Sequence, residues 1–506
     1  MSTQATEEAP DAYEALLDHY EQLSNVNAAS GILQWDQEVM MPEGGTPARS
    51  KQKSALSELS HDLLTDDQVG EWLDELDELE DADLDGEQAA VVREIRRQYE
   101  RADRVPGELV AEISETTSEA LPKWKQAKEE DDFSVFAPVL EDLVELKREY
   151  AEHIDPDKPA YEVLFADYEP YLDLDTAERV LERLREELVP LIEDVRASDV
   201  ELADPFDGEF DVDTQEELAR DVLDTLGYDF EHGRIDTAPH PFSTGNQFDA
   251  RVTTRFSEDD PVDALMSTIH EFGHARYTLG LPREQYGNPL GESRDLTVHE
   301  SQSRLWENHV GRSRVFWEKF LPAMQARFPQ LEDATPEAAY EAANEVYEDN
   351  LIRVEADELT YHMHIIVRFE IERELIEGDL DVEDVPERWN DKYEEYLGIR
   401  PDNDAEGCLQ DIHWSHGSFG YFPTYSLGSV LAAQIYDALE ADVGDVDEKV
   451  RNGNFDVIAD WLEEHVHRHG ARYTTPELVE EATGEPYNAD HFVDYVTEKY
   501  TDLYDL

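Results

Sequence analysis

Two histidines and a glutamate stand together in the segment His270-Glu271-Phe272-Gly273-His274. In a helix, His270 and His274 are one turn apart, so both imidazoles project from the same face and can bind one Zn²⁺. Glu271 lies beside them, where a carboxylate can take a proton from a metal-bound water. The alternative is a pair of histidines on a polar helix face. The spacing favours a hydrolytic zinc site.

A third ligand is expected further along the chain. After His274 the next histidine is His299, which Glu300 follows directly. Leu305 and Trp306 continue this segment with helical spacing. In one class of zinc peptidases a glutamate on a second helix completes the site, so Glu300 is predicted as the third ligand, with His299 as the alternative. Two histidines and one glutamate leave a fourth position for water, which is the catalytic arrangement.

A strand and a helix are predicted to position these residues. Residues Phe248 to Phe256 alternate in polarity with a period of two, which predicts a strand. Asp260 as N-cap and Pro261 at the first helical position then predict a helix that Gly280 ends. The buried face of this helix is expected to contain Val262, Leu265, Met266, Ile269 and Phe272.

The rest of the chain is predicted to be mainly α-helical. Apolar residues recur at three- and four-residue spacing in Asp11 to Ala29 and in Asp175 to Ala197. The segment Tyr425 to Leu439 is the longest apolar candidate, but it contains Gln434 and Asp437 and is interpreted as a buried helix instead of a membrane span. The acidic stretch Ser198 to Asp213 predicts a surface connection and a candidate hinge.

The charge of the chain limits its partners. The 506 residues include 41 Lys and Arg against 123 Asp and Glu, which gives a net charge of −82, while 40% are hydrophobic, enough for a large core. So few cations disfavour binding to nucleic acid and to an anionic membrane surface. The acidic residues are spread along the whole chain. Because the Debye length is about 3 Å at 1 M salt, such a surface suits high salt, and we expect a halophilic protein.

The compartment is predicted from two features. The single cysteine, Cys408, excludes an intramolecular disulfide framework and indicates a reducing environment. Residues Met1 to Pro10 contain neither a basic region nor an apolar run, so no secretory signal is expected. A cytoplasmic protein is therefore predicted.

Seven motifs stand in order along nearly the whole chain. They are LQWDQEVMMPEGG (Leu33 to Gly45), GRIDTAPHPFSTG (Gly233 to Gly245), DARVT (Asp249 to Thr253), HEFGH (His270 to His274), HESQ (His299 to Gln302), IRVEAD (Ile352 to Asp357) and GCLQDIHW (Gly407 to Trp414). With this ordered set the sequence resembles the carboxypeptidase Taq family of zinc metallocarboxypeptidases.

The resemblance implies a fold. It is a mainly α, two-lobed helical body of the gluzincin type, with a deep central groove and a small β-sheet beside the zinc-binding helix. An N-terminal helical part (1–210) would include groove-covering helices, and a catalytic part (211–506) would hold the zinc site, both within one integrated unit. The family is usually homodimeric, so a homodimer is expected.

The resemblance also implies an activity. It places Zn²⁺, or Co²⁺ when substituted, at His270, His274 and Glu300, with Glu271 as general base and then general acid. The expected reaction is sequential removal of residues from peptide C-termini with broad specificity. Two alternatives remain: an endopeptidase or oligopeptidase on the same scaffold, and a non-catalytic, metal-stabilised protein that only binds peptides.

Peptide hydrolysis also requires donors for the oxyanion. The stretch HGSFGYFPTY places Tyr421 and Tyr425 five and nine residues after His416. This spacing resembles the His and Tyr set of helical oligopeptidases such as thimet oligopeptidase, so all three residues are catalytic candidates. The alternative is aromatic packing beside a Gly-rich loop.

An exopeptidase must recognise the terminal carboxylate, for which a guanidinium is the natural partner. Arg353 is the first candidate and Arg251 the second; for each, the alternative is a salt bridge to a nearby acid. Asp249, His240 and His413 are further candidates for substrate contact. The alternative for His413 is helix packing, and the alternative for Asp249 is support of a ligand or substrate-binding residue from behind. The strand Phe248 to Phe256 is also expected to pair with an extended substrate backbone.

Overall fold

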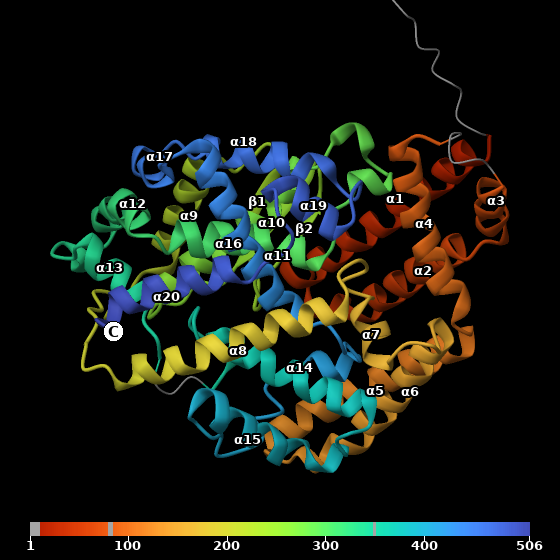
Figure 1. Cartoon of the computed structure of the whole chain (residues 1–506), viewed down its shortest axis with the longest axis horizontal. Helices are drawn as coiled ribbons and strands as arrows, with labels where there is room; N and C mark the ends of the chain where they lie inside the picture. The colour runs from red at the N-terminus through yellow and green to blue at the C-terminus, as the bar shows by residue number, and fades with distance from the viewer. Residues whose placement is uncertain (1–10, 79–83, 348–350) are drawn as a thin grey trace, which may run out of the picture.

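The computed structural model describes residues 11–78, 84–347 and 351–506, which form a mostly helical body with one small sheet (Figure 1). Met1 to Pro10, on which the expectation of no secretory signal depends, lie outside the described residues. The helices are α1 (Asp11–Val39), α2 (Thr46–Leu64), α3 (Asp67–Asp77), α4 (Gly86–Arg104), α5 (Gly107–Glu130), α6 (Ala137–Ile154), α7 (Ala160–Phe165), α8 (Leu174–Ala197), α9 (Val212–Leu226), α10 (Pro261–Gly280), α11 (Leu296–Arg304), α12 (Arg314–Arg327), α13 (Pro336–Ala343), α14 (Tyr361–Glu377), α15 (Val385–Leu397), α16 (Pro423–Val443), α17 (Val446–Asn452), α18 (Asp456–His465), α19 (Thr475–Thr483) and α20 (Asp490–Tyr504).

The sheet has three strands, β1 (Gly233–Thr237), β2 (Ser243–Asn246) and β3 (Asp249–Thr254), in the order β1–β3–β2. Strand β1 runs parallel to β3, and β2 runs antiparallel to it. The predicted strand is confirmed, with ends one and two residues inside the expected range. Because β3 is the central strand and both of its edges are paired, the expectation that it pairs with a substrate backbone is wrong.

The helix predicted over the segment that carries His270 and His274 is confirmed as α10. The Asp260 side chain accepts a hydrogen bond from the backbone N–H of Asp263 at 2.9 Å, and Pro261 takes the first helical position, where its missing N–H is not needed. The helix ends at Gly280. Of the expected inner face, Leu265, Met266, Ile269 and Phe272 are buried, and Val262 is partly buried at the edge of the core.

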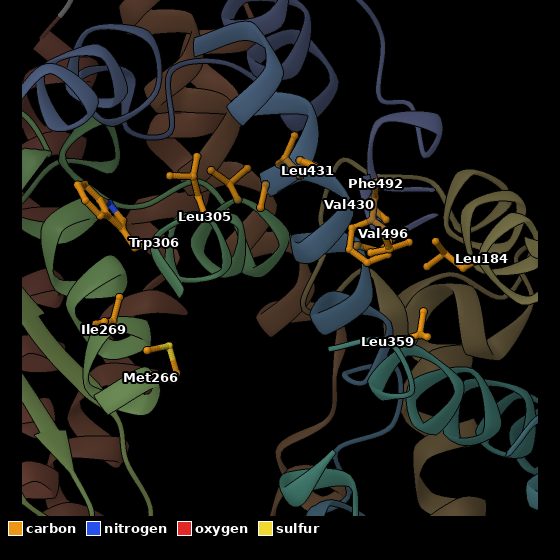
Figure 2. Close-up of a cluster of buried hydrophobic side chains, with 14 of the residues drawn as sticks. Leu184, Met266, Ile269, Leu305, Trp306, Leu359, Val430, Leu431, Phe492 and Val496 are labelled. Atoms are coloured by element: carbon orange, nitrogen blue, oxygen red, sulfur yellow. The ribbon is translucent and has the colours of Figure 1, made fainter. Parts of the chain in front are cut away.

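The main hydrophobic core runs from Val105 to Tyr504 and crosses residue 210. Helix α8, from the N-terminal part, packs against α14, α16 and α20 of the C-terminal part. Figure 2 shows part of this core, which extends from α10 and Trp306 on one side, past Val430 and Leu431 of α16, to α20 and Leu184 of α8 on the other. A smaller core joins α1, α3 and α4. The division into parts 1–210 and 211–506 stays a prediction.

The other predicted elements are found with shifted ends. Helix α1 continues ten residues beyond Ala29, and α8 ends at Ala197 as expected. Helix α16 contains the predicted buried segment, and among the residues described here no helix is long and apolar enough to cross a membrane. The connection between α8 and α9 is irregular, but it is anchored because Phe206 and Phe210 are buried. A hinge at this connection stays a prediction.

Candidate metal centre

His270 and His274 of α10 meet Glu300 of α11, and one ligand atom from each lies within 4.8 Å of the others. The Nε2 atoms of His270 and His274 are 3.7 and 3.4 Å from Glu300 Oε2. The two imidazoles are 17% and 16% exposed, so the trio is open to solvent on one side. Of the two predicted third ligands, Glu300 is the one that the fold brings to the histidine pair.

The outer nitrogen of each histidine has a partner. His270 Nδ1 is 2.9 Å from Glu307 Oε2, and His274 Nδ1 is 2.6 Å from His299 Nδ1. If Nε2 binds a metal, Nδ1 carries the proton and donates to these groups. His299 must then accept as a neutral imidazole, and burial lowers the pKa of His299 to about 3, which keeps it neutral. His299 therefore lies behind His274 and orients it.

A largely covered arginine, Arg304, holds both carboxylates in their charged form. Arg304 Nε donates to Glu300 Oε1 at 2.7 Å, and its Nη1 donates to Glu307 Oε2 at 3.2 Å. Arg312 adds a 3.0 Å bond to the other oxygen of Glu307. Burial alone would raise the pKa of Glu300 and of Glu307, but Arg304 outweighs it, so both pKa values lie well below the usual range.

Two glycines allow α11 to approach its neighbours. A Cβ added at Gly273 of α10 would lie 2.6 Å from Gln302 O, and one at Gly428 of α16 would lie 2.5 Å from Glu300 Cβ. Real Cβ atoms do not come this close, so α11 fits between α10 and α16 only because both positions are glycine. After Arg304 the chain continues as a π-helical segment, η5 (Leu305–Gly311), which carries Glu307.

Glu271 is buried beside the trio. Among the described residues its Oε2 atom has no hydrogen-bond partner. Burial raises the pKa of Glu271, and the neighbouring His274 and His270 oppose that rise. A carboxylate oxygen left without a partner, near enough to His270, His274 and Glu300 for their charges to act on it, suits a bound divalent metal and its water. The residues present therefore fit a catalytic metal.

The sequence profile of the carboxypeptidase Taq (M32) metallopeptidases matches residues 15–500. The chain belongs to this family. It is therefore a metallocarboxypeptidase, whose family uses a metal cofactor.

Known proteins resemble the carboxypeptidase over almost its whole length. It is 38% identical to thermostable carboxypeptidase 1 of Thermus thermophilus, over 97% of this chain and 99% of the relative. It is 37% identical to carboxypeptidase 1 of Bacillus subtilis, over 96% and 97%. The crystal structure of the M32 carboxypeptidase from Deinococcus radiodurans superposes with a TM-score of 0.94 at 38% identity, covering 98% and 100% of the two chains. The predicted fold class is confirmed.

Arg353 of the carboxypeptidase is buried at 8% exposure and already has an anionic partner. Its Nε is 2.9 Å from Asp411 Oδ1, and Arg368 pairs with the other oxygen of the same carboxylate. Arg353 Nη1 points to the hydroxyl of Tyr361 at 3.3 Å, and the guanidinium lies 5.3 Å from the Tyr425 ring. One edge of this guanidinium is thus fixed by Asp411, and the other faces two tyrosines.

Tyr421 and Tyr425 lie on the same side as Arg353. Their rings are 5.3 Å apart, and the Tyr425 ring is 6.2 Å from that of Tyr361. Arg304, which binds Glu300, lies 4.7 Å over the Tyr361 ring, so a continuous set of contacts joins these tyrosines to the metal trio. Burial raises the pKa of Tyr421, and the charge of Glu300 adds to it. Both phenols therefore stay protonated and can donate.

Arg251 and Asp249 lie on strand β3, which packs against α10. Their side chains project from the same face of β3 and pair at 2.6 Å. The guanidinium of Arg251 also stacks 4.2 Å over the ring of Trp35 from α1, and Arg234 approaches the same ring at 5.0 Å. Arg251 is thus held by a carboxylate and an aromatic face, with 17% of its side chain exposed.

The three remaining candidate histidines are placed differently. His413 packs beside Tyr421, with ring centroids 5.5 Å apart, and burial lowers the pKa of His413 to about 4. His416 is exposed, and partial burial together with the charge of Lys125 lowers its pKa. His240 is exposed in the loop between β1 and β2. The described contacts link only His413 to the tyrosine set.

Several residues that support the site were missed from the sequence. Arg304 and Glu307 stand four and seven residues after Glu300, a helical spacing that could have indicated a shared face. Asp411 lies within the motif GCLQDIHW, but nothing local shows that it pairs with Arg353. Tyr361 has no local signal, because tertiary packing alone brings it to Arg304.

Proposed function

We propose that the carboxypeptidase uses Zn²⁺ held by His270, His274 and Glu300, with Co²⁺ able to replace it. Two imidazole nitrogens and one carboxylate oxygen are a common donor set for catalytic zinc, and they leave a position for water. The observation that carries the proposal is the unpartnered, buried Oε2 atom of Glu271 beside this trio. A binding-only site has no need of such a base.

When bound, the metal lowers the pKa of a water and polarises the substrate carbonyl. Glu271 accepts the proton of the attacking water and then delivers it to the leaving amine. His299 and Glu307 keep the two imidazoles in the tautomer that presents Nε2. Arg304 keeps Glu300 ionised.

We assign recognition of the C-terminal carboxylate to Arg353, with Arg251 as the second candidate. Arg353 has one edge fixed by Asp411, and its other donors face the tyrosine set that leads to the metal trio. A planar guanidinium held in this way binds a carboxylate at little entropic cost. Asp249, His240 and His413 are proposed as further substrate contacts, Asp249 through its pairing with Arg251.

The oxyanion donors are proposed to be Tyr421 and Tyr425, with His416 as a third candidate. The phenols are protonated and lie on the Arg353 side of the trio. Removing one such donor commonly lowers kcat about 10²- to 10³-fold. Tyr421→Phe and Tyr425→Phe should each lower kcat with KM little changed. His416→Ala should lower kcat in the same way if His416 is a donor, and an unchanged kcat would remove this exposed residue from the set.

Mass spectrometry of a short peptide incubated with the zinc-loaded protein in multimolar KCl tests the function. A ladder of single C-terminal losses, abolished by chelator and restored by Zn²⁺ or Co²⁺, is expected. A C-terminally amidated copy of the peptide is the matched control and should be cut far more slowly. Internal fragments, or equal cleavage of the amide, would indicate an oligopeptidase. No cleavage by a folded, zinc-loaded sample would indicate a binding protein.

We further propose a halophilic, cytoplasmic homodimer. The net charge of −82 supports the first part, because self-repulsion on this scale is relieved by screening. Thermal melts in 0.1 M KCl and at several molar KCl should differ strongly, and equal melting temperatures would refute it. Light scattering on a sizing column tests the dimer, and fractionation of the source cells tests the compartment.

A further inference from the structure

One face of α4 concentrates positive charge in an otherwise acidic protein. Five arginines stand within twelve residues of this helix: Arg93, Arg96, Arg97, Arg101 and Arg104. All five line one cavity of about 620 Å³, whose lining includes only two carboxylates among the described residues, Asp77 and Glu100. None of the metal trio lines this cavity, so it is a separate feature.

Most of these arginines have a carboxylate partner. Arg93 pairs with Glu94, Arg96 with Asp77, Arg101 with Asp167, and Arg104 with Glu100. Arg97 is different: within the described part of the chain it has no ion pair, and it donates to the backbone carbonyl of Ala166. Burial lowers the pKa of Arg97, and the like charge of Arg101 lowers it further. Asp167 and Glu94 are near enough to oppose this lowering, but neither makes an ion pair with Arg97. A partly buried guanidinium thus stands at the cavity wall without a direct carboxylate contact.

The rest of the cavity wall is suited to an organic molecule. Its apolar lining includes Leu84, Val92 and Ile154, and Tyr171 adds an aromatic ring over which the Arg93 guanidinium lies at 5.2 Å. Ligand pockets commonly enclose about 300 to 1,000 Å³ and combine apolar walls with a few polar groups. This cavity has that size and composition.

We propose that this cavity binds a small organic phosphate. A phosphate group brings up to two negative charges and three acceptor oxygens to one point, which matches the adjacent guanidiniums of Arg97 and Arg101. A single carboxylate supplies one charge and leaves their mutual repulsion only partly relieved. The apolar part of the cavity then takes the organic body of the ligand, and Arg93 and Arg104 reach its further anionic groups.

Isothermal titration with ADP and with inorganic pyrophosphate, at constant ionic strength in the KCl that keeps the protein folded, tests the proposal. Wild type should bind ADP at one saturable site per chain. Replacing Arg97 and Arg101 together with Gln should weaken that binding at least tenfold. The matched control replaces Arg400 and Arg451, two exposed arginines paired with surface acids, and should leave the affinity unchanged.

Three outcomes would overturn the proposal. They are the absence of saturable binding at 10 mM of either phosphate, an equal loss of affinity in the control variant, and tighter binding of citrate than of both phosphates. The last would assign the cavity to polycarboxylates. Should the double variant fail to fold, Arg104→Gln at the half-exposed rim replaces it. That variant should lower the affinity at least threefold, and an unchanged affinity would count against the site.

Discussion

Glu300 of α11 lies against Gly428 of α16 so closely that a Cβ atom at position 428 would be 2.5 Å from the Glu300 Cβ. The backbone position of this proposed metal ligand therefore depends on the absence of a side chain on another helix. Gly273 of α10 sets the opposite face of α11 in the same way, with its added Cβ 2.6 Å from Gln302 O. Glu300 is positioned by the packing of α11 between two other helices, not by its own segment alone.

Gly428→Ala should push α11 away from α16 and move Glu300 out of the trio. Overpacking of this kind costs about 1 to 3 kcal/mol of stability, and the zinc affinity should fall at least tenfold. Chelator titration and urea unfolding measure the two effects. Gly86→Ala in the first turn of α4, where an added Cβ meets nothing within 4 Å, is the control and should be neutral or slightly stabilising. Unchanged zinc affinity in Gly428→Ala would contradict this account of α11.

Glu271→Gln should retain zinc and lose turnover, because the amide cannot accept the proton of the attacking water. Loss of a general base lowers kcat about 10²- to 10⁴-fold. The measurement is kcat on a short peptide, together with zinc content by mass spectrometry. Glu463→Gln, a half-exposed carboxylate paired with Arg276, is the matched control and should be fully active. An active Glu271→Gln variant with normal zinc would refute the assigned role.

Replacing the neighbouring residues Glu300 and His299 separates a ligand from its support. Glu300→Ala should lose zinc, because one of three donors is gone. His299→Ala should keep zinc with affinity about 10- to 100-fold lower, since it removes only the acceptor for His274 Nδ1. Zinc content during dialysis against graded chelator distinguishes the two. The reverse order of affinities would make His299 the ligand.

The buried pair Lys499 and Glu358, neither of which belongs to the metal trio, offers a test of stability. The two side chains are 6% and 2% exposed, and the Tyr495 hydroxyl donates to the same carboxylate. Lys499→Met leaves a buried charge unpaired and should cost about 3 to 5 kcal/mol. Adding Glu358→Gln should recover most of the loss, because no unpaired charge remains. Urea unfolding of the wild type, the two single variants and the double variant measures these effects. If the effect of the double variant equals the sum of the two single effects, the two residues are not coupled.

Glu292 should make stability depend on pH. Burial raises the pKa of Glu292 from 4.5 to about 7, and the Tyr20 hydroxyl donates to its carboxylate at 3.1 Å. The folded state therefore holds a proton that the unfolded chain releases near pH 4.5, so this stabilisation is full below pH 4.5 and is lost as the pH rises through 7. Glu292→Gln stays neutral at every pH. Its stability relative to wild type should rise by about 2 kcal/mol between pH 5 and pH 8, measured by urea unfolding. An equal difference at both pH values would contradict the shift.

Local patterns predicted much of the architecture around the metal. The spacing of His270 and His274 is a property of one helical turn, and the alternation in β3 and the Asp260 cap are equally local, so each could be found without the fold. The expectation for β3 as a docking strand failed for a tertiary reason: its pairing partners β1 and β2 occupy both edges.

The choice between His299 and Glu300 was different. These residues are adjacent on one helix, so their side chains point in directions about 100° apart, and either was chemically suitable. Which one meets His270 depends on the rotation of α11 about its axis. In the fold, α11 packs closely against Gly273 and Gly428, which are distant in sequence, in the orientation that turns Glu300 toward the histidine pair. Spacing within the chain thus determined the histidine pair and the glutamate beside it, whereas packing between helices decided which acidic or imidazole side chain completes the trio.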